Sequence, residues 1–352
     1  MDANSRSSSA IGMVYDWRES FRNYRMNVVS LVELLSDGSF HSGEILGAKL
    51  SISRAAIWKQ IQTLRDLGVS VDAVRGKGYR IAGGIQLLSK KRILSGLYPG
   101  IAEALSGFEV HFSIGSTNSE AMDKASAHYS TYLVLAEHQS SGRGRRGRAW
   151  VSPFGHNLYL SLLWTFTGGV GELEGLSLVC ALAVLRTLNK LSYKGMRVKW
   201  PNDVLFNGKK LAGILLEVNG DVSGPCKLVI GIGLNTYMPI SAGRVIDQPF
   251  SDLRSVNGNV EDRNHIASVL VSELVVMIRE FEVSGFKSFV TEWAVADAYH
   301  GLDIEVGSPR YSQVGICAGV DESGRLLLDT AEGRKVVYGG EVMPSVRPLG
   351  AL

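Results

Sequence analysis

The sequence predicts an α+β fold built from successive parts, and three changes of pattern carry that prediction. Apolar residues between positions 28 and 67 recur at helical spacing, and a short strand hairpin follows them. From residue 85 to about residue 300, strand and helix patterns alternate, which predicts a central mixed sheet with helices packed against it. From residue 301 onward, short strands and tight turns predict a small SH3-like β-barrel.

The first folded part is predicted to contain three helices and a two-stranded wing. Ser53 is a good N-cap for a helix over 54–67, and Gly68 is a good terminator. The buried stripe of that helix is Ile57, Ile61 and Leu64, spaced at i, i+4 and i+7. The valines before Gly-Lys-Gly at 76–78, together with Tyr79 and Ile81 after it, then predict a hairpin. Together these elements indicate a winged helix-turn-helix over 27–84, preceded by a flexible tail over 1–26.

Another face of the same helix is suited to DNA. Residues 42–81 carry seven basic and three acidic side chains, a net charge of +4, which favours contacts with phosphates. The residues expected at the DNA are Ser53, Arg54, Trp58, Lys59, Gln62 and Lys77. The alternative is a small domain that merely shields its neighbour.

The central part, 85–300, is predicted from its alternating elements, and the C-terminal part spans 301–352. Expected strands cover 109–114, 132–137, 157–164, 197–200, 210–218 and 227–235. Expected helices cover 118–127, 173–191 and 264–285.

Composition excludes several classes of protein. The chain has 352 residues, of which 45% are hydrophobic and 20% charged, so it is neither mostly disordered nor collagen-like. The net charge of +3 confines any nucleic-acid surface to a local patch. The three cysteines, Cys180, Cys226 and Cys317, form no CxxC pair and fit a reducing compartment. The longest apolar stretch, 176–185, is too short to cross a bilayer, so we expect a cytoplasmic protein without membrane contact.

The most informative motif is Gly-Arg-Gly-Arg-Arg-Gly-Arg at 142–148. It formally matches GxGxxG, but no helix pattern follows it, which argues against a dinucleotide fingerprint. A Walker loop is excluded because no GK[ST] occurs. Three glycines let backbone amides approach an anion and four arginines can neutralise phosphate, so we interpret the segment as an anion-binding loop. The alternative is a solvated basic loop.

Two further segments carry polar groups suited to a ligand. Lys-Trp-Pro-Asn-Asp at 199–203 predicts a tight turn, and Lys210 opens the apolar strand that follows, where it could hold a phosphoryl oxygen. Asp203 could bind Mg²⁺ or cap the turn. Gly-Ser-Thr-Asn at 115–118 caps a helix and could also bind a small polar ligand. The histidines lack HxxxH or HExxH spacing, and no nucleophile elbow is present.

These motifs together resemble the biotin protein ligase family, in particular its bifunctional bacterial members that also repress the biotin operon. The resemblance rests on GRGRRGR, KWPND and KKLAGIL in that order, and it runs from about Asn27 to the C-terminus. The N-terminal Ser-Arg-Ala-Ala-Ile segment and the GKGY wing are similar to the repressor subtype. The resemblance implies a class II synthetase-like central domain.

The resemblance also implies a reaction in two steps. Biotin and MgATP give biotinyl-5′-AMP and pyrophosphate, and the biotinyl group then passes to one lysine of the biotin carboxyl carrier domain of acetyl-CoA carboxylase. The adenylate would also serve as corepressor, bound to a homodimer on operator DNA. Two alternatives remain open: a lipoate-type protein ligase, which shares the catalytic fold, and a ligand-sensing repressor without ligase activity.

Matching the motifs position by position implies a set of site residues. The biotin ureido ring would contact Ser116, Thr117, Asn118 and Gln139, and the closing loop would supply Arg143, Gly144 and Arg145. Lys210 would bridge the carboxylate and the α-phosphate, while Gly213 and Gly231 would let the backbone approach biotin. The adenylate would contact Arg148, Trp150, Asn202, Asn235 and Phe250. Position 250 departs from the family, since repressor relatives tend to carry Trp there.

Overall fold

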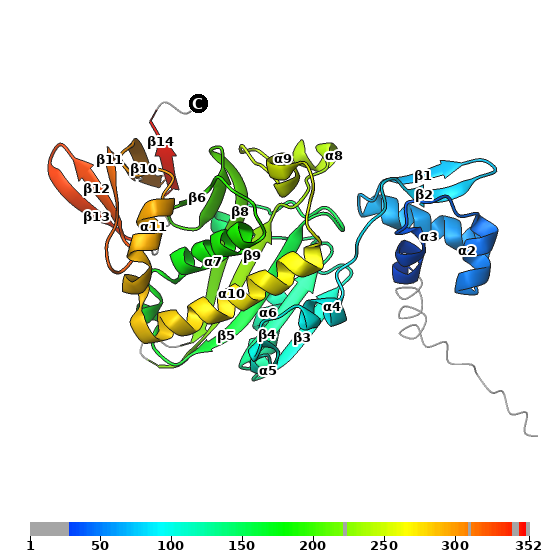
Figure 1. Ribbon diagram of the computed structural model, residues 1–352, viewed down its shortest axis with the longest axis horizontal. Helices are drawn as coiled ribbons and strands as arrows, with labels where there is room; N and C mark the ends of the chain where they lie inside the picture. Colours follow the sequence, from blue (N-terminus) through cyan, green and yellow to red (C-terminus); the bar gives the residue numbers. More distant parts are fainter. Residues whose placement is uncertain (1–27, 221–223, 309–310, 340–344, 350–352) are drawn as a thin grey trace, which may run out of the picture. The chain divides into compact units, whose positions relative to one another are not determined.

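The computed structural model describes residues 28–220, 224–308, 311–339 and 345–349, and these form two compact units. The N-terminal unit ends at Ile85, and the larger unit comprises Gln86 onward together with 67–69. The tail predicted over 1–26 lies outside the described residues. Figure 1 labels the elements, and each unit is described by itself.

The N-terminal unit is a helical domain with a two-stranded wing, as predicted. A helix over 28–35 is followed by α2 (Gly43–Leu50), α3 (Arg54–Asp66), β1 (Val71–Val74) and β2 (Gly78–Ile81). Ser53 caps α3, because its Oγ accepts a hydrogen bond from the Ala56 amide at 3.2 Å. Ile57, Ile61 and Leu64 are fully buried, which confirms the predicted stripe.

A seven-stranded mixed sheet forms the centre of the larger unit. Its strands are β3 (Gly107–His111), β4 (Thr131–Ala136), β5 (Leu158–Phe166), β6 (Met196–Lys199), β7 (Asp203–Phe206), β8 (Lys209–Gly220) and β9 (Cys226–Leu234). Their order is β3-β4-β5-β9-β8-β7-β6, in which only the β3–β4 pair is parallel. The short strand β7 was not expected, since the sequence there predicted only a turn.

Helices cover both faces of this sheet. The helices are α4 (Lys90–Ser95), α5 (Ile101–Ala104), α6 (Thr117–Ser126), α7 (Leu176–Lys190), α8 (Ile240–Gly243), α9 (Leu253–Asn257), α10 (Arg263–Ser284) and α11 (Val290–Ala296). The long helices α7 and α10 pack together on one face, which buries Leu133 and Leu135 of β4 (Figure 1). The alternate residues Tyr132 and Val134 pack against α6, so α6 lies on the opposite face.

The C-terminal part is an antiparallel five-stranded sheet. It contains β10 (Asp303–Ser308), β11 (Tyr311–Val320), β12 (Leu326–Thr330), β13 (Gly333–Val337) and β14 (Ser345–Pro348), in the order β13-β12-β11-β10-β14. Trp200 ties it to the central sheet, because its buried Nε1 donates to the Gly324 carbonyl at 3.0 Å. The C-terminal sheet is therefore fixed beside the end of β6.

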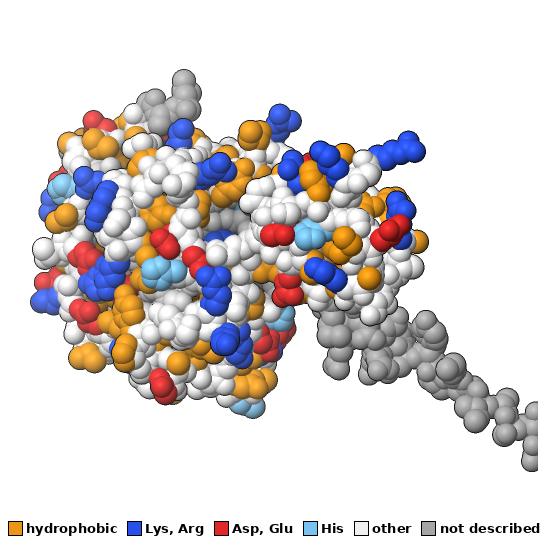
Figure 2. All heavy atoms as spheres, turned by 45° about the vertical axis from the view of Figure 1, so that its right-hand side comes forward, with side chains coloured by type: hydrophobic (Ala, Val, Ile, Leu, Met, Phe, Trp, Pro, Cys, Tyr) orange, Lys and Arg blue, Asp and Glu red, His pale blue; other side chains and the backbone are white. Residues whose placement is uncertain are grey.

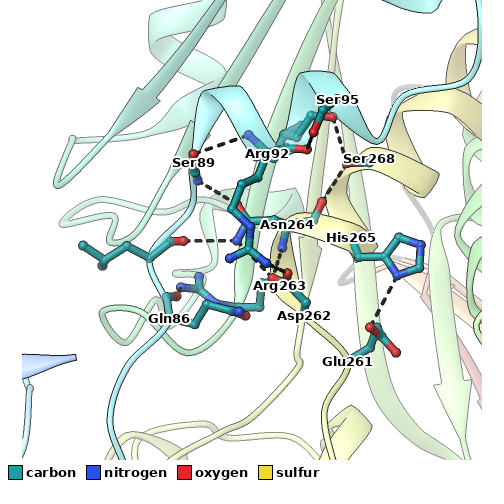
Figure 3. Close-up of polar contacts among 12 residues, drawn as sticks. Gln86, Ser89, Arg92, Ser95, Glu261, Asp262, Arg263, Asn264, His265 and Ser268 are labelled. Atoms are coloured by element: carbon teal, nitrogen blue, oxygen red, sulfur yellow. Dashed lines mark hydrogen bonds and ion pairs between the residues drawn. The ribbon is translucent and has the colours of Figure 1, made fainter. Parts of the chain in front are cut away.

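The chain enters the larger unit through a segment that α10 holds tightly (Figure 3). Asn264 accepts from the Ser89 amide at 2.6 Å and donates to the Leu87 carbonyl at 3.1 Å. Arg263, which is 4% exposed, donates to the Gln86 carbonyl and pairs with Glu137 at 2.8 Å. The buried ion pair thus fixes residues 86–89 at the carboxyl end of β4.

The visible surface of the larger unit is mixed in character. Figure 2 shows acidic, basic and apolar side chains interspersed on the visible face of the larger unit. Within the described residues, no helix combines the length and apolar character needed to span a bilayer. Cys180, Cys226 and Cys317 are buried free thiols.

Candidate functional site

A cavity of about 760 Å³ opens in the larger unit and gathers most of the predicted site residues. The α6 N-terminus, the arginine loop at 142–148, strands β8 and β9, and the C-terminal strand β14 all contribute to its wall. The predicted residues that line it are Ser116, Thr117, Asn118, Gln139, Arg143, Gly144, Arg145, Arg148, Trp150, Asn202, Asp203, Lys210, Gly213 and Gly231. Asn235 and Phe250 are not among the lining residues.

Glycines in adjacent strands hollow out the floor of the cavity. Gly213 of β8 lies opposite Gly233 of β9, and Gly231 lies between Ser161 and Leu215 in the neighbouring strands. Two side chains of the cavity wall pack against these glycines, where a larger residue would collide with them. A Cβ at Gly231 would lie 2.1 Å from Asn118 Oδ1, and one at Gly233 would lie 2.3 Å from the Trp150 ring. The glycines therefore make room for Asn118 and Trp150.

One end of the cavity is a fixed array of neutral polar groups. Gln139 Oε1 accepts from the Thr117 amide at 2.9 Å, and Gln139 Nε2 donates to Ser152 Oγ at 3.2 Å. Asn118 Oδ1 accepts from the buried Ser161 hydroxyl at 2.6 Å. Because Thr117 and Asn118 are at most 5% exposed, these donors and acceptors are held in one arrangement. Such an array can bind a small uncharged group that presents both N–H and C=O.

The other end of the cavity is cationic. Lys210 pairs with Asp203 at 2.7 Å, and its Nζ lies 5.5 Å from the centre of the Trp150 ring. Arg145 donates to Asn202 Oδ1 at 2.9 Å, and burial of its guanidinium lowers its pKa while nearby Asp203 opposes that shift. Burial likewise lowers the pKa of Lys199. Partly buried cations beside one carboxylate form a site for an anionic group.

The arginine loop folds back on itself beside the cavity. The Gly144 amide donates to the Arg148 carbonyl at 2.7 Å, and Arg143 pairs with Ala149 across the loop. A single 3₁₀ turn over Arg145–Gly147 lies at its tip, and residues 149–157 contain no helix. A helix immediately after the glycines is what a dinucleotide fingerprint requires, so the exclusion of that fingerprint is confirmed.

The two predicted residues outside the lining support a neighbouring segment. Lys210 and Phe250 form a bridge, in which the Lys210 amide donates to the Pro249 carbonyl at 3.0 Å. Asn235 Nδ2 donates to the Ser251 carbonyl at 3.1 Å. These bonds hold residues 247–249, which line the cavity, beside the start of β8.

Several residues at or beside the cavity were not assigned roles from the sequence. Lys199 lines it and was visible only as the first letter of KWPND, while Tyr299 and Arg347 reach it from distant parts of the chain. Glu217 of β8 contacts the two lining residues Asn118 and Arg143. No motif marks Tyr299, Arg347 or Glu217.

The predicted DNA-contacting face of the N-terminal unit is exposed. Trp58 is 57% exposed, although it is large and apolar, and Arg54 and Lys59 of the same helix are also exposed. Lys77 at the wing is exposed and lies 5.9 Å from the centre of the Phe40 ring, whereas Gln62 is half-buried. Ser53, at the start of α3, is exposed.

Comparison with protein families matches three segments of the chain. Residues 111–235 match the biotin/lipoate A/B protein ligase family, residues 29–80 match an HTH domain, and residues 309–343 match the biotin protein ligase C-terminal domain. The cavity and its arginine loop lie largely within the first of these matches. The fold and site thus define a protein ligase with an attached helix-turn-helix domain.

Similarity to individual proteins identifies the family within this class of protein ligases. The chain is 40% identical over 314 residues to a bifunctional ligase/repressor of Escherichia coli, covering 89% of this chain and 96% of that protein. It is 30% identical to the bifunctional ligase/repressor of Bacillus subtilis, with 97% of that protein covered. A biotin protein ligase from Aquifex aeolicus, solved with biotin and ATP, superposes with a TM-score of 0.59 at 26% identity, covering 69% of this chain and all of that one. The chain belongs to the bifunctional ligase/repressor family of biotin protein ligases.

Proposed function

We propose that the protein activates biotin with ATP to give biotinyl-5′-AMP, transfers the biotinyl group to a lysine of the biotin carboxyl carrier domain of acetyl-CoA carboxylase, and represses biotin synthesis genes. The single observation that carries the proposal is the two-ended cavity. Its neutral array matches the N–H and C=O groups of a ureido ring, and its cationic end matches a carboxylate and a phosphate. The lipoate alternative lacks this support, because lipoate carries no ureido ring.

The first step needs positioning and charge stabilisation rather than a protein nucleophile. A biotin carboxylate oxygen bonds to the α-phosphorus of ATP, and the bond from that phosphorus to the β-bridging oxygen breaks, so pyrophosphate leaves with the electron pair. Lys210 meets the charge that develops on the phosphoryl oxygens, while Arg145 neutralises the phosphate from the loop side. Among the described residues, none accepts a hydrogen bond from the buried Trp150 indole N–H, which leaves that group as a candidate donor to the ligand.

In the second step, the carrier lysine amine attacks the carbonyl carbon of the mixed anhydride, and AMP leaves. The protein must keep water away from the anhydride until that amine arrives. The arginine loop stands at the cavity wall, where closing it over the adenylate would exclude solvent.

Mg²⁺ fits this site as part of the MgATP substrate. Within the described residues, the only cluster of three acidic or histidine side chains close enough to hold a metal is Glu109, His111 and Glu120, and Lys124 already pairs with both glutamates of that cluster. The cluster also lies outside the cavity lining. Mg²⁺ commonly binds through one carboxylate, several waters and substrate phosphates. Asp203 is the carboxylate that would meet it.

The DNA-binding unit supports repression. A single winged helix contacts one half-site, and joining two of them in a dimer strengthens operator binding greatly. We propose that biotinyl-5′-AMP is the corepressor because it binds the homodimer better than the monomer, which is the only way in which a ligand shifts that equilibrium. Carrier protein would consume the adenylate, so repression would rise when biotin is plentiful and acceptor scarce.

Finer structural assignments belong to the same proposal. We propose domains over 27–84, 85–300 and 301–352, a class II synthetase-like central sheet and an SH3-like C-terminal barrel, in a cytoplasmic protein. The mixed sheet with α6 on one face and α7 and α10 on the other supports the first fold assignment. Five short antiparallel strands support the second.

One assay tests the ligase activity against both alternatives. Purified protein is incubated with ATP and either radiolabelled biotin or radiolabelled lipoate, with and without the cognate carrier domain. We expect a biotinyl adenylate without the carrier and biotinylated carrier with it. Labelling with lipoate but not with biotin would refute biotin as the substrate. If neither acid gave an adenylate, the proposed ligase activity would be refuted.

A binding measurement tests the repressor role. Fluorescent DNA from the promoter of the biotin synthesis genes is titrated with protein, with and without biotin plus ATP, and sedimentation is measured in parallel. We expect biotin plus ATP to promote dimers and tighten binding, and Trp58→Ala to weaken it. A ligand-free protein that is already dimeric and binds the operator equally well would refute the corepressor model.

A further inference from the structure

The cavity has a carboxylate at its edge to which the sequence assigned no role. Glu217 lies on β8, on the same strand as Lys210 and Gly213. Side chains alternate along a strand, so Glu217 shares the face of Gly213 and Leu215, both of which line the cavity. Its side chain is 31% exposed, so it lies where the cavity meets the surface.

The carboxylate of Glu217 contacts two different parts of the site. Oε2 accepts from Asn118 Nδ2 at 2.7 Å, and Oε1 lies 3.2 Å from Arg143 Nη2. The Asn118 amide is fixed in both directions, since its Oδ1 accepts from Ser161 while its Nδ2 donates to Glu217. One carboxylate therefore joins the neutral end of the cavity to the arginine loop.

The contact with Arg143 connects the loop to the sheet. Arg143 is the second residue of the loop, after the buried Gly142, and its side chain is 47% exposed. Besides Glu217, its guanidinium donates to Ser119 Oγ at 3.2 Å, which lies next to Asn118 on α6. An arginine held by a carboxylate on β8 and a hydroxyl on α6 restricts the loop, which also carries Arg145.

We propose that Glu217 is a positioning residue for adenylate formation: its carboxylate orients the Asn118 amide toward biotin and anchors the arginine loop through Arg143. The proposal rests on the proposed function and deepens it. Glu217 itself does not touch the reacting atoms. It acts through one residue that contacts biotin and one that holds the loop over the adenylate.

Glu217→Gln tests whether the charge of the carboxylate matters or only the volume of the side chain. Glutamine keeps the size and one acceptor but loses the charge, and it presents an NH₂ group to one of two partners that are themselves donors. Loss of a charged hydrogen bond at a partly exposed site predicts a rise in the KM for biotin of roughly tenfold. The matched control is Glu120→Gln, which removes a comparably exposed ion pair with Lys124 from the same helix as Asn118 but outside the cavity lining.

A double-mutant cycle tests whether Glu217 acts through Arg143. The biotin KM and the adenylate-formation rate are measured for Glu217→Gln, Arg143→Gln and the double variant. We expect the double variant to lose less than the product of the two single losses, because both remove the same contact. Fully multiplicative losses would overturn the anchoring role.

Limited trypsin digestion gives a readout that does not depend on turnover. The loop offers four arginines, and mass spectrometry maps cleavage at 143–148 with and without biotin plus ATP. We expect ligands to protect the loop in the wild type and in Glu120→Gln, but to protect it several-fold less in Glu217→Gln. Equal protection and an unchanged biotin KM in Glu217→Gln would overturn the proposal, whereas a wild type that makes no biotinyl adenylate would instead refute the proposed function.

Discussion

Substituting Gly231 with alanine tests the geometry of the cavity floor directly. An alanine Cβ there would lie 2.1 Å from Asn118 Oδ1 and 2.9 Å from Asn118 Nδ2, whereas ordinary contacts begin at 3.4 Å. The backbone of β9 cannot move away, because Gly231 is paired with Ser161 on one side and Leu215 on the other. The Asn118 side chain must therefore rotate out of its place.

The cost of that rotation follows from the bonds it breaks. Asn118 would lose the hydrogen bond from Ser161 and the one to Glu217, at 2.6 and 2.7 Å. Leaving buried polar groups unpaired costs about 1–3 kcal/mol. We expect biotin binding to weaken by about 2 kcal/mol, roughly thirtyfold in Kd.

Isothermal titration with biotin in the absence of ATP measures this loss. Gly171→Ala is the control, because, apart from its chain neighbours and the backbone of its own turn, no atom of the described residues lies within 4 Å of a Cβ at that position, and its φ is outside the left-handed region. In an Asn118→Ala background, Gly231→Ala should add little further loss, since the colliding atoms are gone. If Gly231→Ala bound biotin as tightly as the wild type, or if its loss persisted in that background, the steric reasoning would be wrong.

Three other substitutions probe the cationic end, the loop and the pH dependence. Lys210→Gln should slow pyrophosphate release on the order of a hundredfold, because one contact to the developing charge is lost. Substitution of the exposed neighbour, Lys209→Gln, should leave the rate of pyrophosphate release unchanged. Similar rates for the two variants would contradict the role of Lys210. Arg145→Gly should let the adenylate escape and label bystander lysines, so mass spectrometry that found no rise in stray biotinylation would count against a lid. Burial, with a smaller effect of Arg263, lowers the pKa of His156 to about 4. As the pH falls below about 6.5, His156 therefore takes up a proton in the unfolded chain but stays neutral in the folded protein, which favours unfolding. Stability should therefore fall by roughly 2 kcal/mol between pH 7.5 and 5, and urea unfolding of His156→Gln should lack that part of the fall.

Much of the fold could be predicted because local patterns and tertiary packing agree. The stripe Ile57, Ile61 and Leu64 is buried in α3, and the helix predicted over 264–285 matches Arg263–Ser284. The strand over Asp203–Phe206 was missed because it has only four residues and follows turn residues. Its pairing with β6 and β8 supplies the hydrogen bonds that stabilise it, and those partners are not visible in a local pattern.

The parts of the candidate site that could be predicted are those whose functional residues cluster in a short sequence motif. The arginine loop, the Ser-Thr-Asn junction and Lys210 stand out because unusual residues cluster there, and the structure brings them to one cavity. The function of the glycines was predicted less fully. The family resemblance implied that Gly213 and Gly231 let the backbone approach biotin. The structure shows that Gly231 also faces Asn118, and that Gly233, which the sequence analysis did not single out, faces Trp150.

Residues such as Glu217 and Arg347 escape sequence reasoning for a physical reason. A single charged residue near a strand end most often points to solvent, so its pattern carries no signal of a partner. Glu217 meets Arg143 only because β8 crosses the sheet next to β9, whose glycines leave space for α6 to place Asn118 beside the same carboxylate. Three segments far apart in the chain must fold before that contact exists. Sequence reasoning therefore most easily misses contacts that join two parts of a site. Substituting a residue that makes such a contact should change ligand binding and loop closure together.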